Sequence, residues 1–225
     1  MIAFDAKLQT VMDRVHAQHA AQDDQMRSYF RKRFERGGPT AMAFDDDMEQ
    51  FFSDKLVALD RDKAEFCYQV CRALRASRVV EAGTSHGCST LYLAAAVRDN
   101  VGAPARGVVI GTEHEPAKAA AARKNFADAG LSAYIELREG DLNETLKGLT
   151  GPIDFLLLDI WVDAVMPAVR RVAPHLRPGA VIIADNTVQS RDGYEEYFDF
   201  IADPANRLTT VTLPFEGGLE FTVRT

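Results

Sequence analysis

Short apolar runs alternate with helical segments through most of the chain, and this alternation limits the fold more than any other feature. The runs lie at 78–81, 108–112, 134–137, 155–158 and 181–184, and helices are predicted near 88–98, 116–129, 142–149 and 163–176. Strands that are wholly apolar and separated by helices are typical of a parallel sheet covered on both faces. The sequence therefore predicts a doubly wound α/β sheet.

The two ends of the chain depart from this alternation. Residues 208–213 and 219–224 alternate apolar and polar side chains around a glycine-containing turn, which predicts an antiparallel hairpin at one edge of the sheet. The first part of the chain spaces its apolar side chains as helices do. We expect an N-terminal helical extension over 1–44, with a turn signal at 36–40, and a further helical region from 45 to about 74.

Composition and charge narrow the classes of function. The chain has 225 residues and a formal net charge of −7, with no long basic cluster, which argues against nucleic acid as the main partner. The apolar runs are far shorter than the roughly 20 residues that cross a membrane, and the start carries no signal pattern. We expect a cytoplasmic protein with a small-molecule substrate, and we leave a homodimer open. His16 and His19 are expected to face solvent.

The loop after the first predicted strand is rich in glycine. Gly83 and Gly87 allow a tight turn from strand to helix, but the third glycine of the dinucleotide pattern G-x-G-x-x-G is missing. Glu81 ends the strand just before this loop. A carboxylate there would oppose a pyrophosphate and would suit a ligand with an ammonium or sulfonium group. The alternative is a structural residue that bonds to loop amides.

Acidic residues also follow the second and third predicted strands. Glu113 ends the second strand, where a carboxylate can bind both hydroxyls of a ribose, and a structural role is the alternative. Asp141 follows the third strand, where it can contact an adenine edge or cap the next helix, and the two roles can coexist. Because ligands of open α/β sheets bind beyond the carboxyl ends of the strands, we expect these side chains at one site.

Three oxygen-bearing side chains follow the next two strands. Asp159 comes directly after one wholly apolar run, and Asp185 and Asn186 come after the other. A buried carboxylate must be paired or bound to a metal, and neighbouring parallel strands lie only about 4.8 Å apart. Two carboxylates and an amide oxygen form a hard-oxygen set that suits Mg²⁺ or another divalent cation. The alternative is that Asp185 and Asn186 only shape the following turn.

Taken in order, these segments resemble a known family. The motifs VVEAGTSHGCST, GTEHEP, REGD, DFLLLDIWVD, LRPGAVIIADN and LPFEGGLEFTVR are similar to those of class I S-adenosylmethionine-dependent O-methyltransferases. The resemblance is to the metal-dependent kind represented by catechol and caffeoyl-CoA O-methyltransferases, and it covers roughly residues 45–225. It implies one Rossmann-like methyltransferase domain with a seven-stranded, mostly parallel sheet. The implied reaction transfers the sulfonium methyl group to a hydroxyl of a small, aromatic diol.

The resemblance also assigns roles to individual residues. The implied cofactor-binding residues are Glu81, Gly83, Thr84, Ser85, Ser89, Glu113, His114, Gly140, Asp141, Leu142 and Trp161. Glu81 and the loop after it would line the methionine end, Glu113 would hold the ribose, and Asp141 would border the adenine. Asp159, Asp185 and Asn186 match the family's metal ligands, and Asp159 is also the implied catalytic residue.

One departure from the family pattern concerns the general base. Catechol-type members carry a lysine after the metal aspartate, whereas this chain has Val162 in that place. Three interpretations stay open: Asp163 or Tyr194 takes the proton, the metal-bound hydroxyl is acidic enough without a base, or catalysis is weak or lost. The last would leave an S-adenosylmethionine-binding protein. A nicotinamide-dependent oxidoreductase is a weaker alternative, because the glycine fingerprint is broken and no Tyr-x-x-x-Lys pair is present.

Overall fold

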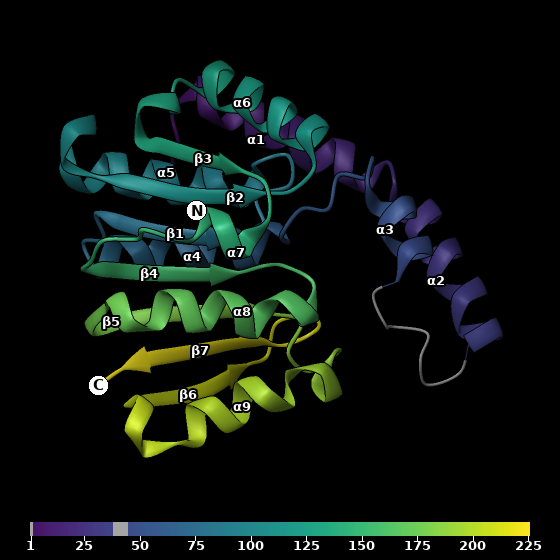
Figure 1. Cartoon of the computed structure of the whole chain (residues 1–225). Helices are drawn as coiled ribbons and strands as arrows, with labels where there is room; N and C mark the ends of the chain where they lie inside the picture. The colour runs from purple at the N-terminus through teal and green to yellow at the C-terminus, as the bar shows by residue number, and fades with distance from the viewer. Residues whose placement is uncertain (1, 38–44) are drawn as a thin grey trace.

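One mixed sheet forms the centre of the molecule (Figure 1). Within residues 2–37 and 45–225, which the computed structural model describes, it contains seven strands. Their order across the sheet is β3 (Ile135–Glu139), β2 (Val108–Glu113), β1 (Arg78–Ala82), β4 (Ile153–Leu158), β5 (Leu176–Asp185), β7 (Leu219–Arg224) and β6 (Leu208–Leu213). β7 runs antiparallel to both of its neighbours, β5 and β6, and the other pairings of this sheet are parallel. The predicted doubly wound sheet with an antiparallel edge hairpin is therefore confirmed.

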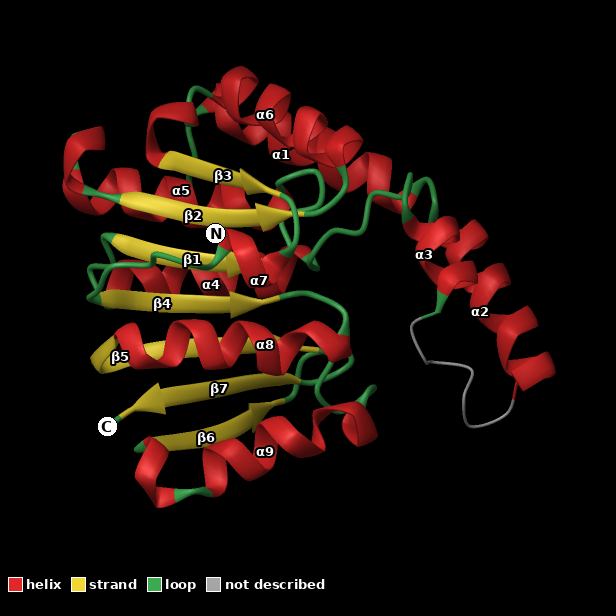
Figure 2. Ribbon diagram, in the orientation of Figure 1, coloured by secondary structure: helices red, strands yellow, loops and turns green. Residues whose placement is uncertain are grey.

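Helices cover both faces of this sheet (Figure 2). One core joins the sheet to α1 (Ala6–Ala20), α4 (Arg61–Ala73), α5 (Cys88–Val101) and α6 (Pro116–Ala129). The other core joins it to α7 (Leu142–Thr145), α8 (Val162–Val172) and α9 (Glu195–Ala202). All six residues of β4 are buried, as expected for a central strand with apolar side chains on both faces.

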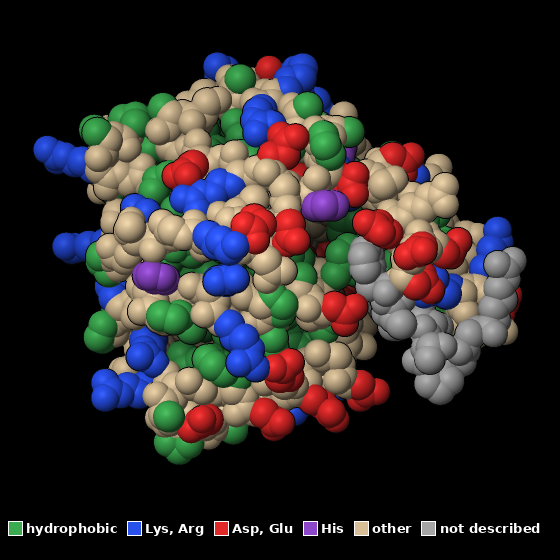
Figure 3. Space-filling model, viewed as in Figure 1, with side chains coloured by type: hydrophobic (Ala, Val, Ile, Leu, Met, Phe, Trp, Pro, Cys, Tyr) green, Lys and Arg blue, Asp and Glu red, His purple; other side chains and the backbone are tan. Residues whose placement is uncertain are grey.

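The register of the parallel strands brings their carboxyl ends to one edge. Ala82 of β1 pairs with Thr112 of β2 and with Leu158 of β4, and Leu158 pairs with Ala184 of β5. The residues that follow these positions therefore meet at one side of the molecule. Figure 3 shows acidic side chains gathered toward that side and basic side chains toward the other.

The helical region predicted from 45 to 74 is two helices rather than one. α3 (Asp46–Phe52) begins after Asp45, whose side chain accepts a hydrogen bond from the amide of Met48, and α4 begins only at Arg61. The stretch between them has no regular secondary structure after a turn, and it buries Leu56 and Leu59 in the core. Burial of these two side chains accounts for the break, which helical periodicity alone did not reveal.

The N-terminal helices behave differently from each other. α1 buries Leu8 and Met12 in the same core as α5 and α6, whereas α2 (Asp23–Gly37) and α3 extend as an arm from the body of the molecule (Figure 1). The predicted boundary between 44 and 45, and most of the turn signal at 36–40, lie outside the described residues. No helix among the described residues has the length and apolar character needed to cross a bilayer.

Neither His16 nor His19 faces solvent as the sequence predicted. The side chain of His19 is 22% exposed, and its Nδ1 atom lies 2.9 Å from the carbonyl oxygen of Leu56. His16 lies half-buried on α1, with its Nε2 atom 3.1 Å from the hydroxyl of Tyr92 and 3.4 Å from the sulfur of Cys88. The error has a physical source: the helix packs on α5, so the polar face that carries His16 is partly covered. Burial lowers the pKa of His16 from its usual value to about 4.

This lowered pKa predicts a loss of stability in mild acid. Between pH 6.5 and about 4 the unfolded chain binds a proton at His16 that the folded chain does not. The free energy of unfolding should therefore decrease as the pH is lowered through this window. Because the ring is partly solvated, we expect a contribution on the order of 1–2 kcal/mol. Urea unfolding at pH 7 and pH 5 should show a smaller difference in His16→Gln than in the wild type. An equal reduction in His175→Gln would contradict the assignment.

Candidate functional site

A pocket of about 390 Å³ opens at the edge where the parallel strands end. Residues from the ends of β1 to β5 and from α3 line it. From the sequence-predicted set, the lining contains Gly83, Thr84, Ser85, Ser89, Glu113, His114, Gly140, Asp141, Leu142, Asp159, Trp161 and Asn186. Glu81 and Asp185 lie outside the lining. The structure thus gathers most of the predicted residues around one cavity, while their individual roles stay predictions.

Gly83 allows the loop after β1 to cross the end of β4. Its φ of +94° lies in the left-handed region, and a Cβ atom built on it would stand 2.1 Å from the carbonyl oxygen of Asp159. The amide of Asp159 in turn donates to the carbonyl of Ala82. The absence of a side chain at this position therefore sets how closely the two strand ends approach each other.

Glu81 is fully buried behind the pocket wall. Its carboxylate accepts hydrogen bonds from the hydroxyls of Thr84, Ser89 and Thr90, and burial raises its pKa. Gly111 of β2 provides the space, since a Cβ there would stand 2.4 Å from the Thr84 hydroxyl oxygen. Glu81 therefore forms hydrogen bonds within the loop and the first turn of the next helix. Its partners are hydroxyls, whereas the structural alternative predicted from the sequence was bonding to loop amides.

The hydrogen bonds to Glu81 determine whether the pocket hydroxyls can donate hydrogen bonds to a ligand or accept them from it. Thr84 and Ser89 line the pocket and commit their hydroxyl protons to Glu81. A hydroxyl that donates its proton to a carboxylate has only lone pairs left for a ligand. This part of the pocket therefore offers acceptors, which suit a ligand that carries an ammonium group.

Glu113 is held by two backbone amides. One carboxylate oxygen accepts from the amide of Ser85 at 2.6 Å and the other accepts from the amide of Glu115 at 2.8 Å. The residue is 9% exposed and lines the pocket, so its orientation is fixed while each oxygen keeps a lone pair for a ligand hydroxyl. Asp141 caps α7 by accepting from the amide of Asn143 at 2.7 Å, which confirms the capping role predicted for it.

Asp185 is occupied by groups of the chain itself. The ammonium of Lys63 lies 2.8 Å from one oxygen of this carboxylate, and the amide nitrogen of Asn186 donates to the other at 2.9 Å. Lys63 also lies 2.9 Å from a carboxylate oxygen of Asp60. Asp159 lines the pocket, and its pKa is raised well above the usual value by burial and then by the negative charge of Asp185. As the side chains stand, the three predicted ligands do not fit a divalent ion, because an ammonium already binds Asp185.

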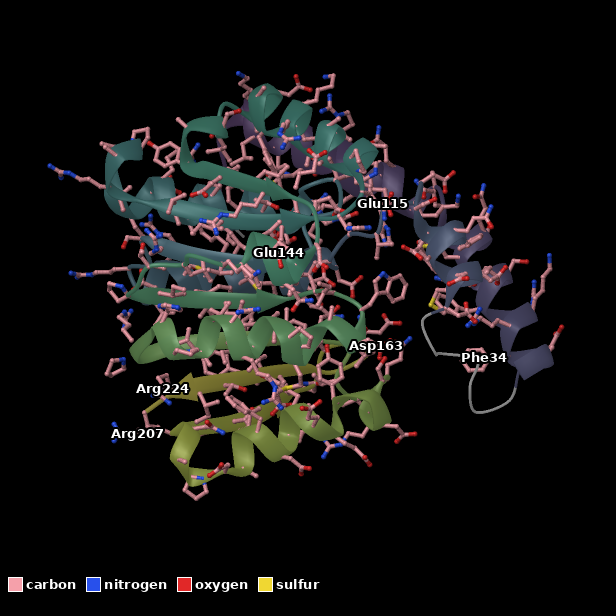
Figure 4. All side chains as sticks on the ribbon, viewed as in Figure 1. Phe34, Glu115, Glu144, Asp163, Arg207 and Arg224 are labelled. Atoms are coloured by element: carbon pink, nitrogen blue, oxygen red, sulfur yellow. The ribbon has the colours of Figure 1, made fainter. Side chains whose placement is uncertain are left out.

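Neither alternative base predicted from the sequence lines the pocket. Tyr194 is buried and donates its hydroxyl proton to the backbone carbonyl of Asp185 at 2.8 Å, and burial raises its pKa. Asp163 is exposed at the start of α8, and Figure 4 shows it at the side of the molecule that also carries Glu115. Val162 packs against Gly193, and a Cβ atom built on this glycine would stand only 2.7 Å from a methyl carbon of the valine.

Sequence reasoning missed the residues that reach the pocket from the N-terminal side. Glu49, Phe52 and Ser53 of the α3 region line it, and Phe52 packs edge-to-face on Trp161 with ring centroids 5.1 Å apart. Lys63 was missed as well. Its spacing from Asp60 was a visible local signal, but its contact with Asp185 joins segments that only the fold brings together.

Comparisons with known proteins agree with the motifs and the fold. A family model described as a methyltransferase domain matches residues 80–187. The chain is 31% identical to a catechol O-methyltransferase of Mycobacterium tuberculosis over 152 residues, which are 67% of this chain and 66% of that protein. The matches span between 60% and 66% of the length of the curated catechol O-methyltransferases.

Solved structures share the fold across most of the chain. A protein from Klebsiella pneumoniae superposes with a TM-score of 0.71 at 23% identity, covering 100% of this chain and 92% of that one. The O-methyltransferase TomG from Streptomyces achromogenes, solved in complex with S-adenosylmethionine, gives a TM-score of 0.64 at 22% identity, covering 79% and 86%. The chain is therefore similar to catechol O-methyltransferases in sequence and to O-methyltransferases in fold, and it contains a match to a methyltransferase domain.

The close approach at Gly83 predicts a stability loss beyond backbone strain. Gly83→Ala must resolve the contact with the carbonyl of Asp159, whereas Gly102→Ala, at φ +70° with nothing within 4 Å, tests strain alone. We expect the control to lose about 1 kcal/mol of unfolding free energy and Gly83→Ala to lose about 1–3 kcal/mol more. Urea unfolding of both variants measures this, and equal losses would show that the contact relaxes without cost.

Proposed function

We propose that this chain is an O-methyltransferase that transfers the methyl group of S-adenosylmethionine to a hydroxyl oxygen of a small aromatic diol. The observation that carries the proposal is the pocket itself. It places the fixed carboxylate of Glu113, the acceptor hydroxyls of Thr84 and Ser89, and the carboxylate of Asp159 around one cavity.

The chain's own groups match the chemical parts of S-adenosylmethionine. The two oxygens of Glu113 can each accept from one hydroxyl of the ribose, because both amide contacts hold the carboxylate in a fixed orientation. Thr84 and Ser89 present lone pairs to the amino group of the methionine part. Leu142 and Trp161 give the pocket apolar and aromatic surface for the adenine and the sulfonium.

The acceptor would lie between Asp159 and the aromatic side chains near it. Among the described residues no hydrogen bond reaches the carboxylate of Asp159, so an acceptor hydroxyl can donate to it and be oriented. Phe52 and Trp161 form an edge-to-face pair at the same pocket, which suits an aromatic ring. The hydroxyl oxygen would then form a bond to the methyl carbon, the C–S electron pair would return to sulfur, and the hydroxyl proton would pass to water. Positioning of the two reactants supplies much of the rate.

The second candidate is a protein that binds S-adenosylmethionine with weak or lost catalysis, and Val162 in place of the family's lysine favours it. The two are separated by incubating the protein with S-adenosylmethionine and catechol and measuring methylated product and S-adenosylhomocysteine by mass spectrometry. Product supports the transferase, and binding without product supports the second candidate. A cytoplasmic location and a homodimer stay predictions.

Glu113 gives the sharpest test of cofactor binding. Glu113→Ala removes a carboxylate that would accept from both ribose hydroxyls, and the loss of a charged hydrogen bond costs about 1.5–3 kcal/mol. Affinity for S-adenosylmethionine should fall roughly tenfold to a hundredfold in isothermal titration calorimetry. Glu196→Ala, which removes an exposed carboxylate paired with Arg170, is the control and should bind as the wild type does. Unchanged affinity in Glu113→Ala would remove this residue from the ribose role.

Val162 predicts how the rate depends on pH. A positioned general base contributes about 10²–10⁴ in rate, so a chain without the lysine should methylate catechol faster as the solution supplies more of the deprotonated acceptor. Single-turnover rates should therefore rise from pH 6 to pH 10, most steeply for acceptors of high pKa. In Val162→Lys the rise should flatten and the rate near neutral pH should increase. A wild-type rate that is flat with pH would show that another base acts.

A further inference from the structure

Lys63 is a buried cation in an unusual place. Its side chain is 2% exposed, although lysine is almost never buried without a partner. It lies in the first turn of α4 and contacts two carboxylates, Asp60 at 2.9 Å and Asp185 at 2.8 Å. Asp60 directly precedes the helix and is half exposed, so it holds the lysine from the solvent side while Asp185 holds it from the strand end.

The negative charge at this edge requires a cation. Asp159 directly follows β4 and Asp185 ends the neighbouring strand β5, in matching register. Carboxylates that share a buried edge cannot both stay charged without compensation. Lys63 supplies positive charge there, because its ammonium lies 2.8 Å from an oxygen of Asp185.

We propose that the ammonium of Lys63 takes the place of a divalent metal ion at this strand edge. The proposal rests on the proposed function, and it changes how that function is carried out. It replaces the ion with a cation that the chain carries itself, fixed by Asp60 on one side and Asp185 on the other.

Lys63 acts through its neighbours as a positioning residue. It leaves Asp185 neutralised and Asp159 facing the pocket, where Asp159 orients the acceptor hydroxyl. The acceptor oxygen forms the new bond to the methyl carbon, sulfur keeps the electron pair of the broken C–S bond, and the hydroxyl proton passes to water. No metal is needed for this balance, so methyl transfer should not depend on a divalent ion.

Binding of Mn²⁺ tests the proposal without any need for catalysis. The electron paramagnetic resonance signal of free Mn²⁺ measures how many ions the metal-stripped protein binds. We expect no ion at the strand edge of the wild type, and one ion per chain in Lys63→Met that a second change, Asp185→Asn, removes. An ion bound by the wild type and lost in Asp185→Asn would overturn the proposal. So would a folded Lys63→Met protein that binds no ion, since Lys63 would then not fill a cation site.

Mn²⁺ binding by the wild type and by Asp185→Asn tests the proposal even if Lys63→Met does not fold. The exposed rim residues Glu49 and His114, with Glu115, bring ligand atoms within 4.8 Å of one another and offer a separate place for Mn²⁺. An ion that the wild type binds and Asp185→Asn retains belongs to that rim, and it leaves the proposal supported because the strand edge is then empty of metal.

Methyl transfer gives the second readout. Metal-stripped wild type should keep its rate within about twofold when Mg²⁺ is added, whereas Lys63→Met should lose about tenfold or more and regain part of it with Mg²⁺. Lys124→Met removes an exposed lysine paired with Asp128 on α6 and should behave as the wild type. Wild-type activity that chelation abolishes and Mg²⁺ restores would overturn the proposal. Absence of methyl transfer in every protein would count against the proposed function alone, because Mn²⁺ binding is measured independently.

Discussion

Four acidic side chains converge on one buried edge of the sheet, and the rest of the site depends on how each negative charge is compensated. Glu81, Glu113, Asp159 and Asp185 stand at or just after the ends of four adjacent parallel strands, whose register aligns them. Carboxylates cannot be taken out of water without hydrogen bonds or opposite charges. The loops and helices around this edge therefore have to supply hydrogen-bond donors or cations. The residues of each loop determine which kind of group it supplies.

The four carboxylates differ in the kind of group that compensates each of them. Three hydroxyls donate to Glu81, two backbone amides donate to Glu113, and an ammonium binds Asp185 together with an amide nitrogen. Donors held in this way are rigid, and rigid donors fix the carboxylates and the hydroxyls that line the pocket. A site arranged before the ligand arrives loses less freedom on binding, which favours both affinity and alignment of the reacting groups.

The sequence predicted which carboxylates lie at this edge of the sheet. It did not predict every group that compensates their negative charge. Apolar runs that end in acidic residues located Glu113, Asp159 and Asp185 correctly, because strand alternation and the rule for carboxyl ends depend only on local pattern and topology. Lys63 and Phe52 could not be found in this way, since their contacts join the N-terminal helices to strand ends far along the chain. The same limit explains His16, whose burial depends on how α1 packs.

Asp159 is the exception among the four, and the proposed acceptor would bind at this exception. Among the described residues no donor reaches its carboxylate, while burial and the charge of Asp185 raise its pKa. The protein leaves this one carboxylate to be satisfied from the pocket side, which Trp161 also lines. A ligand that donates a hydroxyl there would give Asp159 a hydrogen bond, so recognition and alignment of the proposed acceptor would follow from the same uncompensated group. If Lys63 did not neutralise Asp185, Asp159 would carry the repulsion of a second charge as well, and the site would need an added cation before it could hold such a hydroxyl.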